Sequence, residues 1–344
     1  MKAAVITRYG SPDVVRILDA PKPTPAANEV LVRVHTATVN RTDCGELRPH
    51  PFFARLFYGL RRPKRTIFGL DFAGEVESVG IGALSFKPGD RVFGMCPSRS
   101  NGAHAEFVSV PERTVAAMPA GARFDEVVVC EGAFYANAVL TKINLKRGHR
   151  ILIYGASGAI GTAMVQLAKS SGAAVTAVVA TRHLELVKSL GAERAVDYTS
   201  EDFTRIGETF DSVVDAVGQA SFFRCRKLLK PDGVFATTDL GPWGQNLVLA
   251  MWSSIMRNRR VVIPAPRRIN GFVGVLKGLL ETGQFRAVID RKYELAAIAD
   301  AYRYVETGQK VGIVVIDVAA ADVRAHATQD GRTGTEPSAS AIHL

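Results

Sequence analysis

The chain has 344 residues, of which 47% are hydrophobic and 22% are charged, and its formal net charge is +10. This length is enough for two domains with buried cores. No run of about 18 or more apolar residues is present, which excludes an ordinary transmembrane helix. The N-terminus lacks the apolar stretch of a secretory signal, and the four cysteines lack paired spacing. We therefore expect a cytoplasmic protein with free thiols.

Two stretches concentrate the positive charge, residues 48–65 and 257–268, and neither contains an acid. Anionic coenzymes, acidic substrates, a membrane surface or a plain solvated surface would all suit such charge. No nucleic-acid-binding module is recognisable, so we do not expect a nucleic-acid partner. Residues 50–63 are aromatic as well as basic, and they could form a substrate lid, a weak membrane-surface contact, a partner surface or a helix packed on its own domain.

The first 120 residues predict short strands joined by glycine and proline turns. Residues 30–35 alternate apolar and polar side chains, as a half-buried strand does. Residues 72–79 and 91–95 are further strand candidates, separated by the turn at residues 87–90. This pattern predicts a compact, partly closed β-domain.

From about Phe124, strands alternate with helices. Residues 150–154 and 174–179 predict apolar strands, and residues 159–171 and 184–190 predict the helices that follow them. Later strands are predicted over 212–217, 233–237, 260–263 and 311–316, and later helices over 272–281 and 295–306. This alternation predicts a parallel sheet with right-handed crossovers. The small and polar residues 318–344 predict a disordered tail.

The most specific motif is the stretch Gly155-Ala156-Ser157-Gly158-Ala159-Ile160-Gly161, which follows a predicted strand and opens a predicted helix. Gly158 would let the backbone approach a pyrophosphate, and Gly161 would let the helix pack closely on the strand. The helix N-terminus would offer N–H groups to the phosphates. Ala156 departs from the strict glycine pattern, but the strand–turn–helix context still predicts a dinucleotide site.

The end of the following strand bears on which dinucleotide binds. NAD enzymes carry a carboxylate there for the ribose hydroxyl, whereas this strand leads into Thr181 and Arg182. Thr181 could donate a hydrogen bond to a 2′-phosphate, and Arg182 could pair with it. The alternative is that Arg182 is only a solvated residue at a helix start. We predict NADP(H).

Together these stretches resemble the medium-chain dehydrogenase/reductase superfamily, and specifically its zinc-independent, quinone oxidoreductase-like branch. The resemblance covers about residues 1–317. Besides the glycine-rich stretch, the matching segments are residues 1–3, 39–40 with Asp43, 69–76, 87–94, 102–106, 215–218 and 308–312.

The resemblance implies an α/β protein with two domains. Residues 1–123 and 270–317 would form a GroES-like catalytic domain, a partly open β-barrel, and residues 124–269 would form a Rossmann domain with a doubly wound parallel sheet. NADP(H) would bind at the glycine-rich stretch, Thr181, Arg182, Val217 and Gly218. Hydride would pass in the interdomain cleft to a quinone, enone or similar activated double bond, and the protein would be a homodimer.

The residues at the zinc positions of the superfamily do not suit a metal. Zinc dehydrogenases carry a cysteine ligand where this chain has Asn40, and Gly-His-Glu where it has Gly69-Leu70-Asp71. Leucine cannot ligate a metal, and catalytic zinc needs about three protein ligands. Between residues 90 and 115 the sequence holds a single cysteine, Cys96, where a structural zinc lobe needs four. We therefore expect no metal site.

Without a metal, hydrogen-bond donors would stabilise charge on a substrate carbonyl. Asn40 is the first candidate, because its amide can donate without being ionised, although it could equally stabilise a turn. Asp43 would orient neighbouring groups or cap a helix. Some relatives carry a tyrosine where this chain has Gly45, so Tyr135 or Tyr58 would replace it, unless both are packing residues and water delivers the proton.

Two other functions stay open. One is NADP-dependent oxidation or reduction of an alcohol or aldehyde, which the missing metal disfavours. The other is a coenzyme-binding regulatory or membrane-peripheral protein with little catalysis, which the loss of the tyrosine at Gly45 keeps open.

Overall fold

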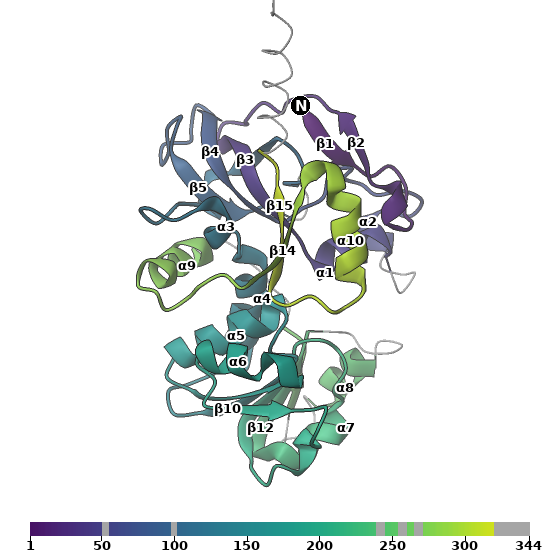
Figure 1. The fold of residues 1–344 in the computed structure, drawn as a ribbon, viewed down its shortest axis with the longest axis vertical. Helices are drawn as coiled ribbons and strands as arrows, with labels where there is room; N and C mark the ends of the chain where they lie inside the picture. The colour runs from purple at the N-terminus through teal and green to yellow at the C-terminus, as the bar shows by residue number, and fades with distance from the viewer. Residues whose placement is uncertain (50–54, 98–101, 239–244, 254–259, 265–270, 320–344) are drawn as a thin grey trace, which may run out of the picture.

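The computed structural model describes residues 1–49, 55–97, 102–238, 245–253, 260–264 and 271–319. Its strands form a seven-stranded sheet, a six-stranded sheet and a ribbon of β1 (Lys2–Val5) and β2 (Arg16–Asp19). Figure 1 shows the seven-stranded sheet in the upper half of the molecule and the six-stranded sheet in the lower half, with α4 (Cys130–Lys142) between them. The chain is therefore α/β, with a GroES-like domain above a Rossmann-like domain.

The seven-stranded sheet is organised around β3 (Glu29–Val39), which pairs antiparallel with β4 (Asp71–Val79), β6 (Phe107–Pro111) and β15 (Ile313–Asp317). The outer strands are β5 (Arg91–Met95), β7 (Val115–Ala117) and β14 (Ile289–Glu294). The alternating pattern predicted a strand ending at residue 35, but β3 continues to Val39. Residues 36–39 pair with the C-terminal strand β15, and this non-local pairing extends β3 beyond the local pattern.

The six-stranded sheet is parallel throughout, with the order β10-β9-β8-β11-β12-β13. Its strands are β8 (Arg150–Tyr154), β9 (Ala174–Val179), β10 (Arg194–Asp197), β11 (Phe210–Asp215), β12 (Leu229–Thr237) and β13 (Arg260–Val262). From β8 the chain builds outward to β10 and then restarts at β11 on the other side. The crevice between the carboxyl ends of β8 and β11 is where open sheets of this kind bind ligands.

The helices connect and cover these sheets. α5 (Ala159–Ser170) follows β8 and packs against α4, and a Cβ on Gly132 of α4 would lie 2.9 Å from the Ala159 carbonyl oxygen. One buried apolar cluster includes Phe93 of β5, Val139 of α4 and Ile151 of β8, so the core is continuous between the two sheets. The remaining helices are α1 (Arg41–Leu47), α2 (Arg55–Tyr58), α3 (Phe124–Val127), α6 (Leu184–Ser189), α7 (Phe222–Cys225), α8 (Gln245–Ser253), α9 (Phe272–Glu281) and α10 (Ile298–Glu306).

The domain limits stay a prediction, and the packing differs from them in two details. α3 packs on β3 and β4, past the expected limit at residue 123. Val318, expected in the tail, is buried and donates a backbone hydrogen bond to the His35 carbonyl at 2.9 Å. The rest of the expected tail, residues 320–344, lies outside the described residues, as do residues 50–54 of the basic aromatic segment. Within the described ranges, every helix is too short or too polar to span a bilayer.

Candidate active site

The glycine-rich turn, residues 155–161, lies at the carboxyl end of β8. A Cβ on Gly161 would lie 2.2 Å from the Gly155 carbonyl oxygen, so the helix packs as closely on the turn as predicted. A Cβ on Gly158 would meet only that same oxygen, at 3.8 Å, so Gly158 borders open space. Within the described chain, no side chain caps the N-terminus of α5. An uncapped helix start beside an open glycine fits a pyrophosphate, so these residues suit the expected coenzyme.

The rest of the turn is anchored in the protein. Ala156 and Ala159 are buried in the apolar core, which is how the turn accommodates an alanine in place of a glycine, and Ile160 packs against that core. The Ser157 carbonyl accepts a hydrogen bond of 2.8 Å from the Gly312 amide, and Gly158 forms a β-bridge with Gly312. The turn is therefore tied to the residue that leads into β15 of the upper domain.

The loop after β11 brings Val217 and Gly218 beside this turn. The Asp215 carboxylate accepts hydrogen bonds from the amides of Val217 at 3.0 Å and Gly218 at 2.9 Å, which fixes the loop. Gly155, with φ of +76°, lies under Val217, whose Cγ1 would be 2.5 Å from a Cβ on that glycine. The two segments that the sequence assigned to the coenzyme thus meet at one sheet edge.

The strand end expected to select the coenzyme contains a contact that the sequence did not reveal. Thr181 donates a hydrogen bond to the carboxylate of Asp197, the last residue of the neighbouring strand β10, at 2.5 Å. Hydrogen bonds from Thr181 and then Thr199 lower the pKa of Asp197 to about 2. In this structure the Thr181 hydroxyl hydrogen is thus directed to Asp197, and its donation to a 2′-phosphate stays a prediction. Arg182 is exposed, and its Nε donates to His183 Nε2 at 3.0 Å.

Asn40 lies between β3 and α1, at the N-cap position of α1, and is buried. Its side-chain Nδ2 donates to Thr38 Oγ1 at 2.8 Å and lies 3.5 Å from Asp71 Oδ2, while its Oδ1 has no hydrogen-bond partner among the described residues. The amide hydrogens therefore point into the protein. This geometry favours a positioning role for Asn40 over the expected donor role toward a substrate carbonyl.

Asp43 both caps a helix and orients its neighbours, as the two sequence hypotheses allowed. One carboxylate oxygen of Asp43 accepts a hydrogen bond from the backbone amide of Asn40 at 2.8 Å. The other accepts one from the backbone amide of Gly69 at 3.1 Å. The carboxyl is completely buried, and this burial raises its pKa to about 6.

Asp43 belongs to a group of four buried carboxyls, the acid pocket, with Glu46, Asp71 and Glu131. Asp71 accepts a hydrogen bond from the Glu131 amide at 2.7 Å, and burial followed by the Glu131 charge raises the pKa of Asp71 well above its usual range. Glu46 pairs with the buried Arg65, whose Nε lies 2.9 Å from Glu46 Oε2. Among the described residues, these four acids thus lie where solvent is excluded, and Arg65 is the one cation that pairs directly with a member of the group.

Tyr135 lies half-buried on α4, one helical turn after Glu131. Thr42 of α1 donates a hydrogen bond to Glu131 Oε1, and it also acts to lower the pKa of the Tyr135 hydroxyl. Burial raises the pKa of Glu131 to about 7. Burial, and then the Glu131 charge, raises the pKa of the Tyr135 hydroxyl. The sequence nominated Tyr135 but missed Glu131 and Thr42, although Glu131 and Tyr135 show the four-residue spacing of one helix face.

Lys310 approaches this group from the segment before β15. Its Nζ donates to the Gly312 carbonyl at 2.7 Å, and its charge acts on Glu131 and Asp71. Burial is the main cause that lowers the pKa of Lys310. The negative charges of the acids around it act in the opposite direction and favour the charged form of Lys310. Since Gly312 also binds Ser157, Lys310 links the glycine-rich turn to the acid pocket.

The structure also shows where no such chemistry gathers. In the described ranges, no group of three or more His, Cys, Asp or Glu side chains is arranged to hold a metal ion.

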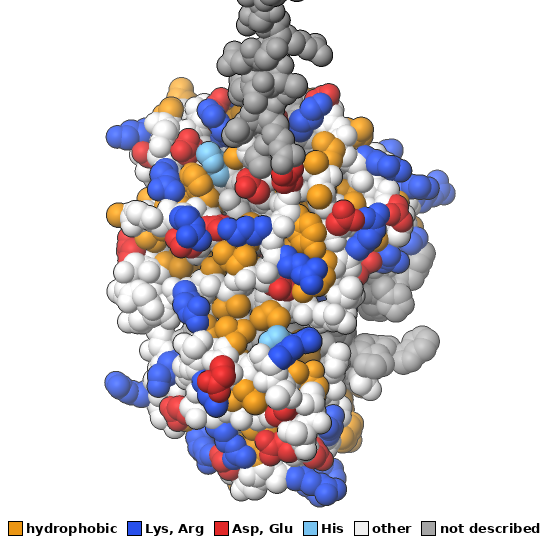
Figure 2. Space-filling view, viewed as in Figure 1, with side chains coloured by type: hydrophobic (Ala, Val, Ile, Leu, Met, Phe, Trp, Pro, Cys, Tyr) orange, Lys and Arg blue, Asp and Glu red, His pale blue; other side chains and the backbone are white. Residues whose placement is uncertain are grey.

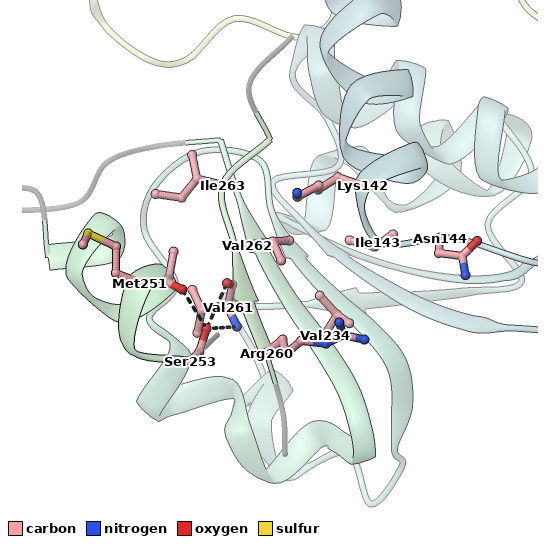
Figure 3. A pocket seen from close by; sticks show the side chains of 11 residues that line it. Lys142, Ile143, Asn144, Val234, Met251, Ser253, Arg260, Val261, Val262 and Ile263 are labelled. Atoms are coloured by element: carbon pink, nitrogen blue, oxygen red, sulfur yellow. Dashed lines mark hydrogen bonds between the residues drawn. The ribbon is translucent and has the colours of Figure 1, made fainter. Parts of the chain in front are cut away.

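A cavity of about 620 Å³ lies beside β13 and α8, away from the glycine-rich turn, and is lined by Val234, Met251, Arg260 and their neighbours (Figure 3). Ser253 there bonds both the amide and the carbonyl of Val261.

Comparisons with known proteins agree with this architecture. The family model for the alcohol dehydrogenase GroES-like domain matches residues 26–120, and the model described as zinc-binding dehydrogenase matches residues 190–316. The 2-methylene-furan-3-one reductase of Solanum lycopersicum is 32% identical over 332 residues, covering 92% of this chain and 79% of that protein. The chloroplastic NADPH-dependent alkenal/one oxidoreductase of Arabidopsis thaliana is 28% identical, with the same coverage.

Among solved structures, the quinone oxidoreductase from Coxiella burnetii matches with a TM-score of 0.82 and 26% sequence identity. The match covers 92% of this chain and 99% of that chain. The order of the elements, the glycine-rich turn at the switch between β8 and β11, and these matches all agree. The chain belongs to the medium-chain dehydrogenase/reductase superfamily of oxidoreductases, in its quinone oxidoreductase-like branch.

Proposed function

We propose that the protein is a zinc-independent reductase that uses NADPH to reduce a quinone, an enone or a similar activated double bond. The observation that carries this proposal is the hydrogen bond between Gly312 and Ser157, which ties the open turn at Gly158 to the segment holding Lys310 and, through it, to the acid pocket. When bound, NADPH would supply the hydride. The protein would bind and orient both reactants, exclude water and supply the proton.

The proposed substrate class follows from the relatives and from the donors in the pocket. The relatives are named for a methylene-furanone, alkenals and alkenones, and quinones, in which a carbon–carbon double bond is conjugated to a carbonyl. Hydride addition to such a bond places negative charge on the carbonyl oxygen, and a nearby hydroxyl donor stabilises it. Tyr135 is the proposed donor, while Asn40 and Asp43 hold the start of α1 in place.

NADPH is proposed over NADH on the basis of Arg182. Its guanidinium lies at the surface beyond the end of β9, where the adenosine ribose of a bound dinucleotide would lie. Asp197, which Thr181 and Thr199 keep ionised, would oppose a 2′-phosphate, so the proposed preference rests on the Arg182 charge. A relative named as NADPH-dependent supports the same choice.

Zinc independence is proposed from the residues at the superfamily's metal positions. Leu70 is buried in the core and offers no ligand atom, and Asn40 directs its amide nitrogen toward Thr38. The competing function, metal-assisted oxidation or reduction of an alcohol or aldehyde, needs a ligand set that these residues do not provide. One equivalent of tightly bound zinc by elemental analysis would contradict the proposal.

The proposed partners are a second copy of the chain and, more weakly, an anionic membrane surface. Leu56 and Leu60 are 63% and 60% exposed, and the exposed cations Arg61, Arg62 and Lys64 follow them. On the face in Figure 2, by contrast, Lys and Arg side chains are scattered among Asp and Glu rather than gathered in one field. Co-sedimentation with phosphatidylserine vesicles and light scattering test the membrane contact and the dimer.

The central experiment follows NADPH absorbance in the presence of benzoquinone, cyclohexenone, an alkenal, and a simple alcohol–aldehyde pair. We expect turnover with the conjugated acceptors and little with the simple pair. Calorimetric titration with NADPH and NADH accompanies it, and we expect tighter binding of NADPH. Binding without turnover on any acceptor would favour a regulatory protein, and no binding of either coenzyme would contradict the whole proposal.

A further inference from the structure

One buried side chain of the Rossmann domain forms two hydrogen bonds with the backbone of the upper domain. Gln166 of α5 donates from its Nε2 to the Arg286 carbonyl oxygen at 3.2 Å, and its Oε1 accepts a hydrogen bond from the Arg286 amide at 2.9 Å. A carboxamide suits this contact because one planar group supplies both a donor and an acceptor. Gln166 therefore binds a residue 120 positions later in the chain, exchanging two hydrogen bonds as paired antiparallel residues do.

The upper domain holds α5 at a second point as well. Arg286 belongs to the segment 284–288, which leads from α9 to β14. At the start of α5, the Gly312 amide donates a hydrogen bond to the Ser157 carbonyl at 2.8 Å. Gln166 lies roughly 12 Å further along the helix, at about 1.5 Å per residue. Figure 1 shows α5 on the side of the lower half that faces the upper half, so both attachments lie at the boundary between the domains.

Two separated attachments fix an angle that one attachment leaves free, because two bodies joined at a single point can rotate about it. β15, which follows Gly312, pairs with β3, and there Val314 lies opposite Val39, the residue before Asn40. The angle between the domains therefore sets the distance between the glycine-rich turn and the acid pocket. Building on the proposed function, we propose that Gln166 is a positioning residue that fixes this angle and thereby aligns the coenzyme with the substrate.

Two further contacts join the same segments, but both lie at the surface. Ser170 Oγ donates to Gln284 Oε1 at 2.8 Å, and Arg286 Nη2 donates to Ser189 Oγ at 2.9 Å. Water competes for exposed hydrogen bonds of this kind, whereas the Gln166 side chain is buried and shielded from it. We therefore assign the positioning role to Gln166 and use Gln284 as its matched control.

The kinetic test depends on the geometry of hydride transfer, for which a misplacement of about 1 Å can lower the rate about 100-fold. Gln166→Met keeps the length of the side chain but removes both hydrogen bonds, so kcat with cyclohexenone and NADPH should fall about 10- to 100-fold. NADPH affinity in calorimetric titration should change less than about threefold, because the glycine-rich turn that holds the phosphates is retained. Gln284→Met makes the same change at an exposed contact and should behave as the wild type in both measurements.

Gln166→Glu tests the two hydrogen bonds themselves. A protonated carboxyl supplies a donor and an acceptor, as the carboxamide does, whereas a carboxylate only accepts. Burial raises the pKa of such a carboxyl, so the variant should approach the wild-type kcat at about pH 5 and share the loss of Gln166→Met at about pH 8. The kcat of the variant is measured relative to the wild type at each pH. An equal ratio at both pH values would contradict the role of these hydrogen bonds.

The angle between the domains can be measured without coenzyme or substrate. Spin labels on cysteines that replace two exposed residues, Ile81 in the upper domain and Arg205 in the Rossmann domain, report the distance between the domains. The four native cysteines are buried and should stay unlabelled. We expect one narrow distance distribution in the labelled protein, a broader one when Gln166→Met is added, and the narrow one again with Gln284→Met.

The outcomes separate this proposal from the proposed function. An unchanged distance distribution in Gln166→Met would overturn the positioning role, and so would an unchanged kcat, and either result would leave the reductase proposal intact. Absence of wild-type turnover with every acceptor would overturn the reductase proposal, while the distance measurement would still decide whether Gln166 fixes the angle. If Gln166→Met does not fold, the comparison of Gln166→Glu at the two pH values decides the question.

Discussion

The glycine-rich turn and the acid pocket are built in opposite ways. The turn comes from seven consecutive residues, and its geometry depends on local backbone requirements such as the positive φ of Gly155. The acid pocket joins α1, β4, α4 and the segment before β15, and the contacts that join these elements are distant in sequence. A contiguous site tolerates changes elsewhere in the fold, whereas an assembled site depends on every element that contributes to it. The following experiments test this contrast.

The largest expected effect is on the buried ion pair of the acid pocket. Arg65→Leu leaves the Glu46 carboxyl without its cationic partner and should reduce the free energy of unfolding by about 3–5 kcal/mol at pH 8. Burial already raises the pKa of Glu46 to about 7, so at pH 5 this carboxyl is neutral and the loss should be smaller. Urea denaturation at both pH values measures the difference.

The matched control for this change is Arg123→Leu. Arg123 is 67% exposed, and its buried partner Asp125 keeps a second cationic partner in Lys292, so removing Arg123 should lower the free energy of unfolding far less than Arg65→Leu does. Equal losses in the two variants would mean that the acid pocket is no more sensitive than the surface.

The next effect concerns the pH dependence of stability. The pKa of Glu131 is raised by burial from 4.5 to about 7, so the unfolded chain releases this proton at a lower pH than the folded protein does. The stabilising contribution is complete below pH 4.5 and is lost as pH rises through about 7, up to about 3 kcal/mol. Glu131→Gln removes this loss, so its stability relative to the wild type should improve between pH 5 and pH 8. Parallel stability curves for the two proteins would contradict this account.

A smaller effect is expected at the glycine-rich turn. Gly161→Ala places a methyl group against the Gly155 carbonyl oxygen, and the overpacking should cost about 1–3 kcal/mol of stability and weaken NADPH binding. Gly274→Ala is the control, because Gly274 lies in helix α9 with no atom within 4 Å of its added Cβ. Thermal unfolding and calorimetric titration should separate the two variants, and identical behaviour would mean that close packing at Gly161 is unimportant.

The smallest effect is on coenzyme preference. Arg182→Ala should reduce the NADPH-to-NADH affinity ratio by about tenfold, because one exposed charge-assisted bond to the 2′-phosphate would be lost. Arg205→Ala, 86% exposed on the same domain, should leave the ratio unchanged. An unchanged ratio in Arg182→Ala would remove this residue from coenzyme selection.

Much of the fold followed from the sequence because its signals are local. The apolar strands β8 and β9 have the predicted bounds, and the helix after the glycine-rich turn begins at the predicted Ala159. The end of β3 and the ordering of Val318 did not follow from local pattern, because both depend on pairing between the two ends of the chain. The contacts among the site residues also did not follow from local pattern, because they too join distant parts of the chain.

What the sequence determined by itself was the glycine-rich turn, the alternation of strands and helices, and the family, since backbone conformation and hydrophobic period are written in neighbouring residues. What only the tertiary structure decided was which side chains meet. Thr181 binds Asp197 because two parallel strands end side by side, and Thr42 binds Glu131 because α1 and α4 lie together. The physical reason is that a buried polar group forms its hydrogen bond with whichever group the fold places beside it. The number of residues between two side chains in the sequence does not determine their distance in space.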